Sequence, residues 1–235
     1  MKIYGKNVAL EALKENKKIH KIYLNNKFKD DEILSLIERK KISTKVLDNR
    51  ELDKMCKGLH QGIILEVEDI KTYSFDEIIP NITTEYPLIV ILDHLEDPHN
   101  LGAIVRSSEA FGVDAIIIPN DRSVQITSTV VKTSVGTIEK VKIVNVPNIN
   151  NAIRKLKDLG YWIVGTDMEG TNYTEIDYKR KIGLVIGNEG KGISKVTTSN
   201  CDYIAKIPMK GTVNSLNASV ACGIFLSEIN RSRGI

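Results

Sequence analysis

The sequence predicts an α/β protein of two domains, and three observations lead to this prediction. The chain has 235 residues, of which 42% are hydrophobic and 27% are charged, as is typical of globular proteins with one or two domains. Short helical and strand-like patterns alternate along it. From about residue 88 the strand-like segments become almost continuously apolar, which indicates a parallel sheet covered by helices on both faces.

The first 68 residues predict a small α/β domain. Apolar residues at helical spacing indicate helices at 8–13, 30–40 and 50–57, and β-prone runs indicate strands at 21–24, 44–47 and 62–67. Residues 1–70 hold 15 Lys and Arg against 12 Asp and Glu, whereas residues 71–235 hold 18 of each. The basic excess favours contact between this domain and a polyanion such as RNA, although a solvated, slightly basic face explains the counts equally well.

A linker is predicted at residues 69–86, where no strong periodicity is visible. The domain that follows, residues 87–235, has expected strands at 88–92, 115–118, 162–164 and 182–186. Its expected helices lie at 101–111, 127–135, 151–159 and 216–230. This order of strands and helices predicts a mostly parallel sheet.

Composition argues against several classes of protein. No stretch approaches the roughly 18 apolar residues that span a bilayer, and the first residues do not resemble a signal-peptide core, so we expect a cytoplasmic protein with no membrane partner. Cys56, Cys201 and Cys222 include no C-x-x-C pair, so we expect reduced, mostly buried thiols and no zinc site. Asp93 and Asp97 have no further ligand-type neighbours in a metal-binding pattern, so no metal is expected.

The most specific segment, residues 93–112, reads DHLEDPHNLGAIVRSSEAFG and follows the first strand of the second domain. Ligands bind at the carboxyl ends of strands in open parallel sheets. Asn100 is expected to cap the helix, and Arg106 lies six residues further on, where it can reach toward the same cleft. A surface arginine on an ordinary capped helix is the simpler interpretation of Arg106.

Two further segments carry candidate binding residues. Residues 186–193, IGNEGKGI, follow another apolar strand but match neither the phosphate-loop nor the dinucleotide fingerprint. Residues 207–221, IPMKGTVNSLNASVA, lead into the last helix, where Asn214 or Ser215 offers an N-cap and Leu216, Val220 and Phe225 are expected to form a packed stripe. Taken singly, each segment is equally typical of a glycine-rich turn or a helix cap.

Together the three segments resemble, in order and spacing, the signature motifs of the SpoU (TrmH-like) branch of the SPOUT RNA methyltransferases. GKNVALEAL at 5–13 and HQGI at 60–63 are similar to the N-terminal domain of the RlmB-type subgroup, an L30e-like RNA binder. The resemblance covers nearly the whole chain. It implies a SPOUT α/β knot, in which a mostly parallel sheet carries a deep trefoil knot, behind a small N-terminal L30e-like α/β substrate-binding domain.

The resemblance also implies an activity and a set of site residues. The activity is 2'-O-methylation of a ribose in structured RNA by a homodimer that uses S-adenosylmethionine and no metal. Its expected target is a guanosine in the peptidyl-transferase region of 23S ribosomal RNA. The implied catalytic residues are Arg106, Asn100, Glu189, Ser215 and Asn217, and the implied cofactor-binding residues are Gly187, Ile207, Leu216, Thr166, Ile186 and Met209.

The family proposal makes the counterpart of Arg106 the general base, but a guanidinium stays protonated in proteins. Our hypothesis is that Arg106 holds the nucleotide phosphate and stabilises developing negative charge on the attacking oxygen. His60 lies in the other domain and is expected to be structural or to contact RNA. Alternatives to the main prediction are the same chemistry on tRNA or on a ribosomal RNA site that confers antibiotic resistance, and a non-catalytic RNA-binding factor in ribosome assembly.

Overall fold

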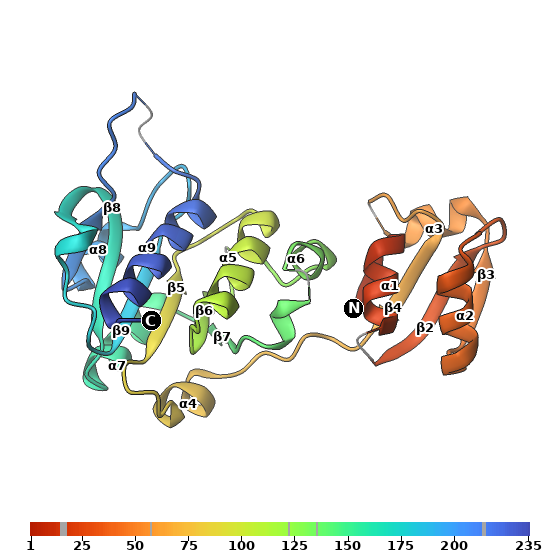
Figure 1. The fold of residues 1–235 in the computed structure, drawn as a ribbon, viewed down its shortest axis with the longest axis horizontal. Coiled ribbons are helices and arrows are strands. Elements are labelled where there is room, and N and C mark those ends of the chain that lie inside the picture. The colour runs from red at the N-terminus through yellow and green to blue at the C-terminus, as the bar shows by residue number, and fades with distance from the viewer. Residues whose placement is uncertain (15–17, 57, 122, 135, 213–214) are drawn as a thin grey trace. The chain divides into compact units, whose positions relative to one another are not determined.

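The computed structural model describes residues 1–14, 18–56, 58–121, 123–134, 136–212 and 215–235 (Figure 1). The chain divides into two compact units. Unit 1 comprises Met1–Ile70 and Ile126–Lys132, and unit 2 comprises Lys71–Gln125 and Thr133–Ile235. In the described parts of the chain, no helix is long and apolar enough to cross a membrane.

Unit 1 contains a four-stranded sheet in the order β1-β4-β2-β3. The strands are β1 (Lys2–Tyr4), β2 (Ile19–Asn25), β3 (Thr44–Leu47) and β4 (Ile63–Val67). Strand β4 pairs antiparallel with β1 and β2, whereas β3 runs parallel to β2. The three strands predicted for this domain are therefore confirmed. Among the described strands of unit 1, the prediction missed β1, which is too short for its alternation to be visible.

The helices of this sheet unit are α1 (Lys6–Lys14), α2 (Asp31–Lys40) and α3 (Asn49–Met55). Asp30 caps α2 by accepting a hydrogen bond from the backbone N–H of Ile33 at 3.2 Å. Asp48 and Glu51 form a capping box at the start of α3. Helix α3 ends at Met55, so the predicted helix 50–57 was too long, and its last residue, Lys57, lies outside the described residues.

Unit 2 contains a six-stranded sheet in the order β10-β8-β9-β5-β6-β7, in which every neighbouring pair is parallel. Its strands are β5 (Leu88–Leu92), β6 (Ala115–Pro119), β7 (Ile143–Val146), β8 (Trp162–Asn172), β9 (Ile182–Ile186) and β10 (Tyr203–Lys206). Every residue of β5, β6 and β9 is buried, because helices cover both faces of the sheet. The predicted parallel sheet is confirmed.

Helices of ordinary length lie on both sides of this sheet. Figure 1 shows α5 (Pro98–Ala110) and α9 (Ala218–Arg233) side by side across one face, where they pack against each other. On the other face α7 (Ile149–Asp158) buries Ile149, Ala152, Ile153 and Leu156 at helical spacing in the main hydrophobic core. A shorter helix of unit 2 is α8 (Lys195–Asn200). Helix α6 (Ser128–Thr133) lies almost entirely in the segment Ile126–Lys132 of unit 1. The predicted helix 127–135 was longer than α6, and Val135 lies outside the described residues.

Part of the segment predicted as a linker packs onto unit 2. Tyr73 pairs with β7, donating its N–H to the carbonyl of Ile143 at 2.9 Å and accepting from the N–H of Asn145 at 2.9 Å. Helix α4 (Phe75–Ile78) and the 3₁₀ turn η1 (Ile79–Asn81) follow, and Phe75 and Ile79 are buried in the core. Elements this short do not repeat an apolar pattern, so the sequence did not reveal them.

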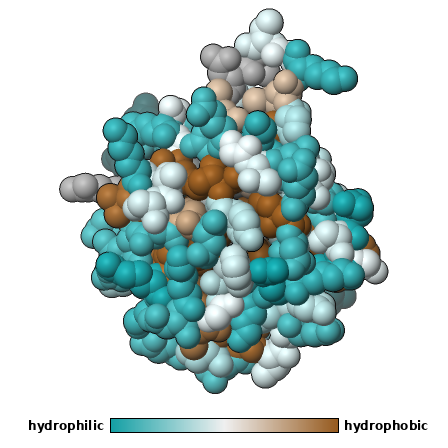
Figure 2. Space-filling model, turned by 90° about the vertical axis from the view of Figure 1, so that its left-hand side faces the viewer, coloured by the Kyte–Doolittle hydropathy of each residue, from teal (hydrophilic) through white to brown (hydrophobic). Residues whose placement is uncertain are grey.

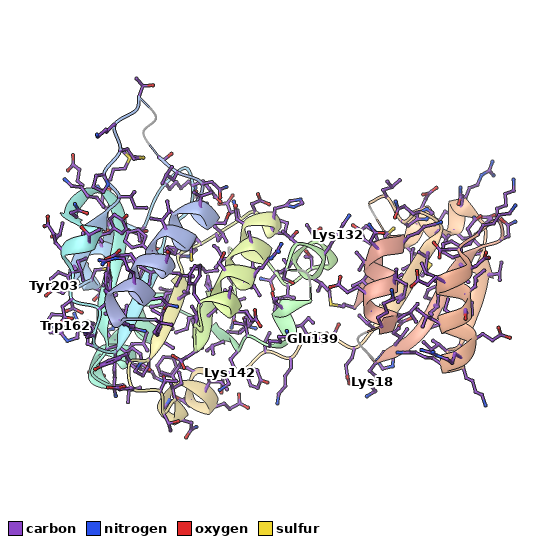
Figure 3. All side chains as sticks on the ribbon, in the orientation of Figure 1. Lys18, Lys132, Glu139, Lys142, Trp162 and Tyr203 are labelled. Atoms are coloured by element: carbon purple, nitrogen blue, oxygen red, sulfur yellow. The ribbon has the colours of Figure 1, made fainter. Side chains whose placement is uncertain are left out.

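Aromatic residues protect the edge of the sheet at β10. Trp162 and Tyr203 stack with their ring centroids 5.6 Å apart, and Figure 3 shows both at the outer side of unit 2. The Arg180 guanidinium lies 4.5 Å from the centroid of the Trp162 ring, a cation–π contact. Figure 2 views this end of the molecule and shows apolar side chains gathered between hydrophilic ones, and the exposed large apolar residues of unit 2 include Met168 and Val196.

Candidate functional site

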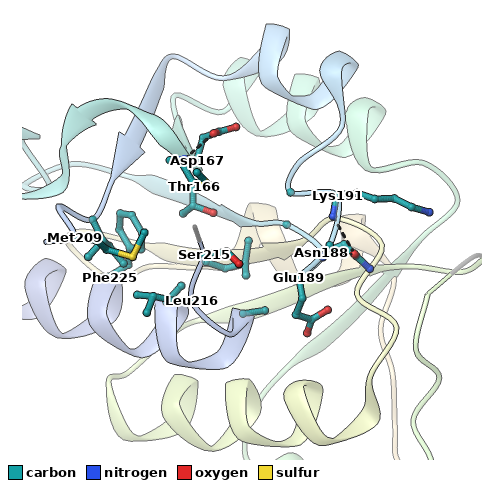
Figure 4. Close-up of a pocket in the computed structure, with 17 residues that line it drawn as sticks. Thr166, Asp167, Asn188, Glu189, Lys191, Met209, Ser215, Leu216 and Phe225 are labelled. Carbon is teal, nitrogen blue, oxygen red and sulfur yellow. Dashed lines mark hydrogen bonds between the residues drawn. The ribbon is translucent and has the colours of Figure 1, made fainter. Parts of the chain in front are cut away.

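A cavity of about 390 Å³ opens at the carboxyl end of β9 and beside the middle of β8 (Figure 4). Three separate segments line it: residues 166–168 at the bend of β8, residues 186–192 after β9, and residues of the stretch 207–225 that leads into α9. Its size falls within the roughly 300–1,000 Å³ range of small-molecule sites. The location is the one expected for a ligand of a parallel α/β sheet.

The cavity has an apolar side and a polar side. Figure 4 shows Met209, Leu216 and Phe225 grouped at one side, while Asn188 and Glu189 lie at the other. All six residues predicted to bind a cofactor are among those that line it, namely Gly187, Ile207, Leu216, Thr166, Ile186 and Met209. Of the five predicted catalytic residues, Glu189 and Ser215 also line the cavity.

Sequence reasoning missed some of the lining residues. Asp167 and Met168 belong to the cavity wall because β8 continues to Asn172, well beyond its predicted end at residue 164. The register of β8 against β10 shifts between Ile204 and Ala205, which leaves residues 166–170 of β8 unpaired with β10. This irregularity takes five consecutive residues of β8 out of the pairing with β10, and the local alternation of apolar residues does not predict it.

The loop after β9 closes tightly on itself. Asn188 and Gly192 exchange backbone hydrogen bonds of 3.1 and 2.8 Å. A Cβ atom on Gly187 would lie 2.3 Å from the carbonyl carbon of Gly192 and 2.5 Å from the nitrogen of Ile193, so only glycine fits there. The glycines of this segment therefore shape the wall of the cavity by letting two backbone strands of the loop approach each other.

Asp93 fastens this loop to the end of β5. Its carboxylate is buried, accepts the backbone N–H of Ser194 at 2.8 Å and contacts the Nδ1 atom of His94. The Asn188 side chain in turn donates to the carbonyl of His94 at 3.2 Å. Asp97 caps α5 by accepting from the N–H of His99 at 2.8 Å. Both aspartates that the sequence raised as metal ligands thus bind backbone groups.

A hydrogen-bonded chain joins three of the predicted catalytic residues. The Asn217 side-chain oxygen caps α9 by accepting from the N–H groups of Ser219 and Val220 at 3.0 and 3.3 Å. Its amide nitrogen is therefore free to donate to the Asn100 side-chain oxygen at 2.8 Å. The Asn100 amide nitrogen then donates to the carboxylate of Glu189. Because the cap defines the orientation of Asn217, it also determines which atom Asn100 presents to Glu189.

These contacts correct three expectations. Asn100 does not cap its helix, because Asp97 does so and leaves Asn100 buried within the first turn. Ser215 is not the cap of the last helix, which begins at Ala218 rather than residue 216, and Asn214 lies outside the described residues. Val220 is 50% exposed and is not part of a packed stripe, whereas Phe225 is buried as expected.

Arg106 does not take part in the hydrogen-bonded chain that joins Asn100, Glu189 and Asn217. It is exposed on α5 and is not among the residues that line the cavity. Its neighbours Ile104 and Val105 are buried, so the helix presents Arg106 on the surface opposite its packed face. The structure therefore brings together Asn100, Glu189 and Asn217, with Ser215 lining the same cavity, but does not place Arg106 in the wall.

The remaining reactive groups of the described chain do not form a second chemical centre. No cluster of three or more His, Cys, Asp or Glu side chains suited to a metal ion occurs among the described residues. Burial raises the pKa of Cys201 and of Cys222 to about 12, so both thiols stay protonated near neutral pH and are poor nucleophiles. Cys222 is fully buried, whereas Cys56 and Cys201 are half-buried.

Comparison with known families accounts for both units. Residues 87–227 match the model of the SpoU rRNA Methylase family, and residues 2–73 match the model described as RNA 2'-O ribose methyltransferase substrate binding. With the parallel sheet and the cavity at its carboxyl edge, these matches define an RNA methyltransferase with an N-terminal substrate-binding domain. The chain belongs to the SpoU rRNA methylase family.

Individual relatives agree along the whole chain. A protein of Staphylococcus saprophyticus named as a TrmH family tRNA/rRNA methyltransferase is 40% identical, over 98% of this chain and 95% of the relative. YacO of Bacillus subtilis, with the same family name, is 36% identical over the same shares. The crystal structure of the SpoU methyltransferase AviRb from Streptomyces viridochromogenes in complex with AdoMet has a TM-score of 0.78 and 22% identity, and covers 99% of this chain and 90% of AviRb. This similarity confirms the predicted fold class.

Proposed function

We propose that this protein transfers the methyl group of S-adenosylmethionine to a ribose 2'-oxygen in structured RNA. The observation that carries the proposal is the convergence of three distant segments on one cavity, with the Glu189 of its wall hydrogen-bonded through Asn100 to Asn217. Family membership supplies the reaction class. The name of the family model matched by residues 2–73 supports the ribose 2'-oxygen as the acceptor.

The residues of the cavity suit the proposed cofactor. Met209, Leu216 and Phe225 offer an apolar surface for an adenine ring, and Asp167 and Glu189 place carboxylates where a cationic ligand is favoured. Gly187 keeps the loop backbone against the cavity, so its peptide groups can bind the edges of the cofactor. The relative AviRb binds AdoMet on the same fold.

When bound, S-adenosylmethionine supplies an electrophilic methyl group, and the protein has to align the ribose oxygen with it. Alignment alone removes a large part of the barrier by removing translational freedom. The chain from Asn217 through Asn100 to Glu189 has a single hydrogen-bond sense, so the Glu189 carboxylate is held in one orientation in the cavity wall. We propose that Glu189 and Ser215 orient the reacting nucleotide, while Asn100 and Asn217 hold Glu189.

Arg106 enters the proposal as an electrostatic group. Its guanidinium remains charged in proteins and matches the geometry of a phosphate oxygen pair. Because Arg106 is exposed and outside the cavity wall, we propose that the protein acts as a homodimer in which Arg106 serves the cavity of the partner subunit. There it would hold the RNA phosphate and stabilise the negative charge that develops on the attacking oxygen.

We propose ribosomal RNA as the substrate, with a guanosine in the peptidyl-transferase region of 23S RNA as the expected site, in the cytoplasm. The family name and the RlmB-type motifs of unit 1, GKNVALEAL and HQGI, support this target. The relatives are named as tRNA/rRNA methyltransferases, which keeps tRNA as the second candidate substrate.

The direct test is transfer of labelled methyl from S-adenosylmethionine to unmodified 23S RNA, 16S RNA and tRNA in parallel, followed by mapping of the modified ribose. We expect label in 23S RNA alone and a loss of at least a hundredfold in rate for Arg106→Ala, since removal of one such charged contact typically costs that much. Label in tRNA would retain the chemistry and overturn the target. Cofactor binding without transfer to naked RNA or to ribosomal subunits would favour the assembly-factor alternative.

A further inference from the structure

We infer that unit 1 carries a pocket that binds one unpaired nucleotide of the RNA substrate, with its phosphate on Lys27 and Lys29 and its base against Phe28 and Leu59. This inference rests on the proposed function only in taking RNA as the substrate. The pocket, of about 530 Å³, lies entirely within residues 6–62. It is separate from the cavity of unit 2.

The shape of the pocket distinguishes a floor from a rim. Phe28, His60 and Gly62 are buried or half-buried and form the floor, whereas Lys27, Lys29, Asn49, Asp53, Leu59 and Gln61 are exposed at the rim. A Cβ on Gly62 would lie 3.1 Å from the Phe28 ring, so the absence of a side chain at Gly62 allows the ring to pack against the backbone. The result is a hollow with an aromatic floor, which suits a planar base.

Hydrogen bonds fix the positions of two residues of the pocket, His60 and Gln61. The backbone N–H of Gly62 donates to Nδ1 of His60 at 2.9 Å, so Nδ1 is the acceptor and the proton sits on Nε2, which donates to Asp53 at 3.0 Å. Both ring nitrogens of His60 are thus engaged, and the side chain has a structural role in the floor. Gln61 adopts a left-handed backbone with φ of 51° and accepts the N–H of Lys6 at 2.8 Å. A strained residue held by such contacts is common at binding sites.

Two of the three lysines that line the pocket have side chains available to bind a phosphate group. The Lys6 ammonium is engaged by the carbonyl of Lys29 at 3.0 Å and by Asp30 at 3.4 Å, and it lies over the Phe28 ring. The acidic groups are used as well, because Asp53 accepts from His60 and Asp30 caps α2. Across the described residues, no ion pair or side-chain hydrogen bond engages the ammonium of Lys27 or Lys29. The rim therefore carries the Lys27 and Lys29 ammonium groups, which can bind a phosphodiester, together with the one negative charge of Asp53.

The pocket also offers groups that can contact a base. Leu59 is 80% exposed and leaves an apolar surface for the second face of a base. The Asn49 side-chain oxygen accepts a hydrogen bond from the Asn25 amide at 2.7 Å. The Asn49 amide nitrogen can therefore act as a donor to a base. A base can enter such a pocket only when it is not paired in a helix, because a paired base stays stacked between its neighbours and only an unstacked base can be splayed out onto a protein surface.

The test measures binding of the full chain, without S-adenosylmethionine, to a fully paired RNA hairpin and to the same hairpin with a one-nucleotide bulge of each base. We expect the wild type to bind at least one bulged hairpin about fivefold or more tightly. Lys27→Ala with Lys29→Ala should weaken binding about tenfold or more and reduce the salt dependence by about two phosphate contacts. Leu59→Ser should remove the preference for the bulge while keeping the salt dependence.

The matched control is Lys2→Ala with Lys45→Ala, which removes the same charge from exposed strand positions of unit 1 outside the pocket. Equal binding of paired and bulged hairpins by the wild type, or equal losses in the pocket and control variants, would overturn the inference. Methyl transfer is measured separately on ribosomal RNA. An inactive wild type whose bulge preference disappears in the pocket variants would keep the pocket and reject the proposed reaction.

Discussion

Asn217 illustrates how one side chain can serve both the fold and the site. Its oxygen caps α9, and its amide nitrogen reaches Asn100, which lies 117 residues earlier in the chain. An amide has distinct donor and acceptor ends, so the cap leaves only one hydrogen-bond sense for the contacts that end at Glu189. The Asn217 side chain therefore both stabilises the start of the last helix and orients a residue of the cavity wall.

Substitution of Gly187 tests whether the close backbone approach in the loop after β9 is needed for cofactor binding. Gly187→Ala would place a Cβ within 2.3 Å of the Gly192 backbone, so we expect the loop to shift and the affinity for S-adenosylmethionine to fall by at least about tenfold. Gly190→Ala is the matched control, because its Cβ would meet only the Asn188 side chain at 3.6 Å. Calorimetric titration of both variants with the cofactor measures the difference, and equal affinities would contradict this account of the loop.

Helix α9 shows how an element can be stabilised by its own charges. Glu228 is buried and accepts two hydrogen bonds from Arg231, one turn later, at 2.7 and 2.6 Å. The hydrogen bonds from Arg231 lower the pKa of the Glu228 carboxyl from its ordinary value. The helix ends at Gly234, whose φ of 84° closes it in the left-handed region that favours glycine.

The lowered pKa of Glu228 predicts a pH-dependent stability. A carboxylate with a depressed pKa in the folded state stabilises the fold fully above its unfolded pKa, about 4.3, and that contribution is lost as pH falls through the folded value. We expect Glu228→Gln to lower the Tm by about 2–4 °C at pH 7 and to approach the wild type in strong acid. Glu169→Gln, at an exposed glutamate of unit 2, is the control in the same melting series. A Tm difference independent of pH would contradict the role of this ion pair.

At the scale of the whole molecule, the position of Arg106 favours a shared site. Asn100, Glu189 and Asn217 are joined within one chain, whereas Arg106 is exposed on α5 outside the cavity wall. A homodimer with two-fold symmetry would supply each cavity with the same group from the partner. The proposed dimer is therefore part of the mechanism and not only a form of assembly.

Subunit complementation tests this arrangement. Arg106→Ala and Asn100→Ala should each be inactive alone, but their co-expressed mixture should recover roughly a quarter of wild-type methyl transfer, because half of the dimers are mixed and each has one intact site. Sedimentation of each variant checks that dimers form. Activity no higher than the sum of the two variants would show that Arg106 serves the cavity of its own subunit.

Local patterns in the sequence were sufficient to predict the α/β class, the bounds of β5 and β9, and the three segments that carry the site. These follow from local patterns: continuous apolar runs, capping residues and glycines occupy a few neighbouring positions. The family motifs extended this local information to a reaction class, and six residues expected to bind the cofactor line one cavity. The local pattern did not reveal α4, β7 and β10, each of which is only four residues long.

The contacts between those segments could be identified only in the folded chain. The cap of α9 is Asn217 and not the predicted Asn214 or Ser215, and Asn100 bridges Asn217 and Glu189 instead of capping α5. Asp167 belongs to the part of β8 that is unpaired with β10, and this interruption depends on the register between the two strands. Each of these outcomes depends on partners far away in the chain, and a hydrogen-bonding side chain selects its partner only after folding has brought the candidates together.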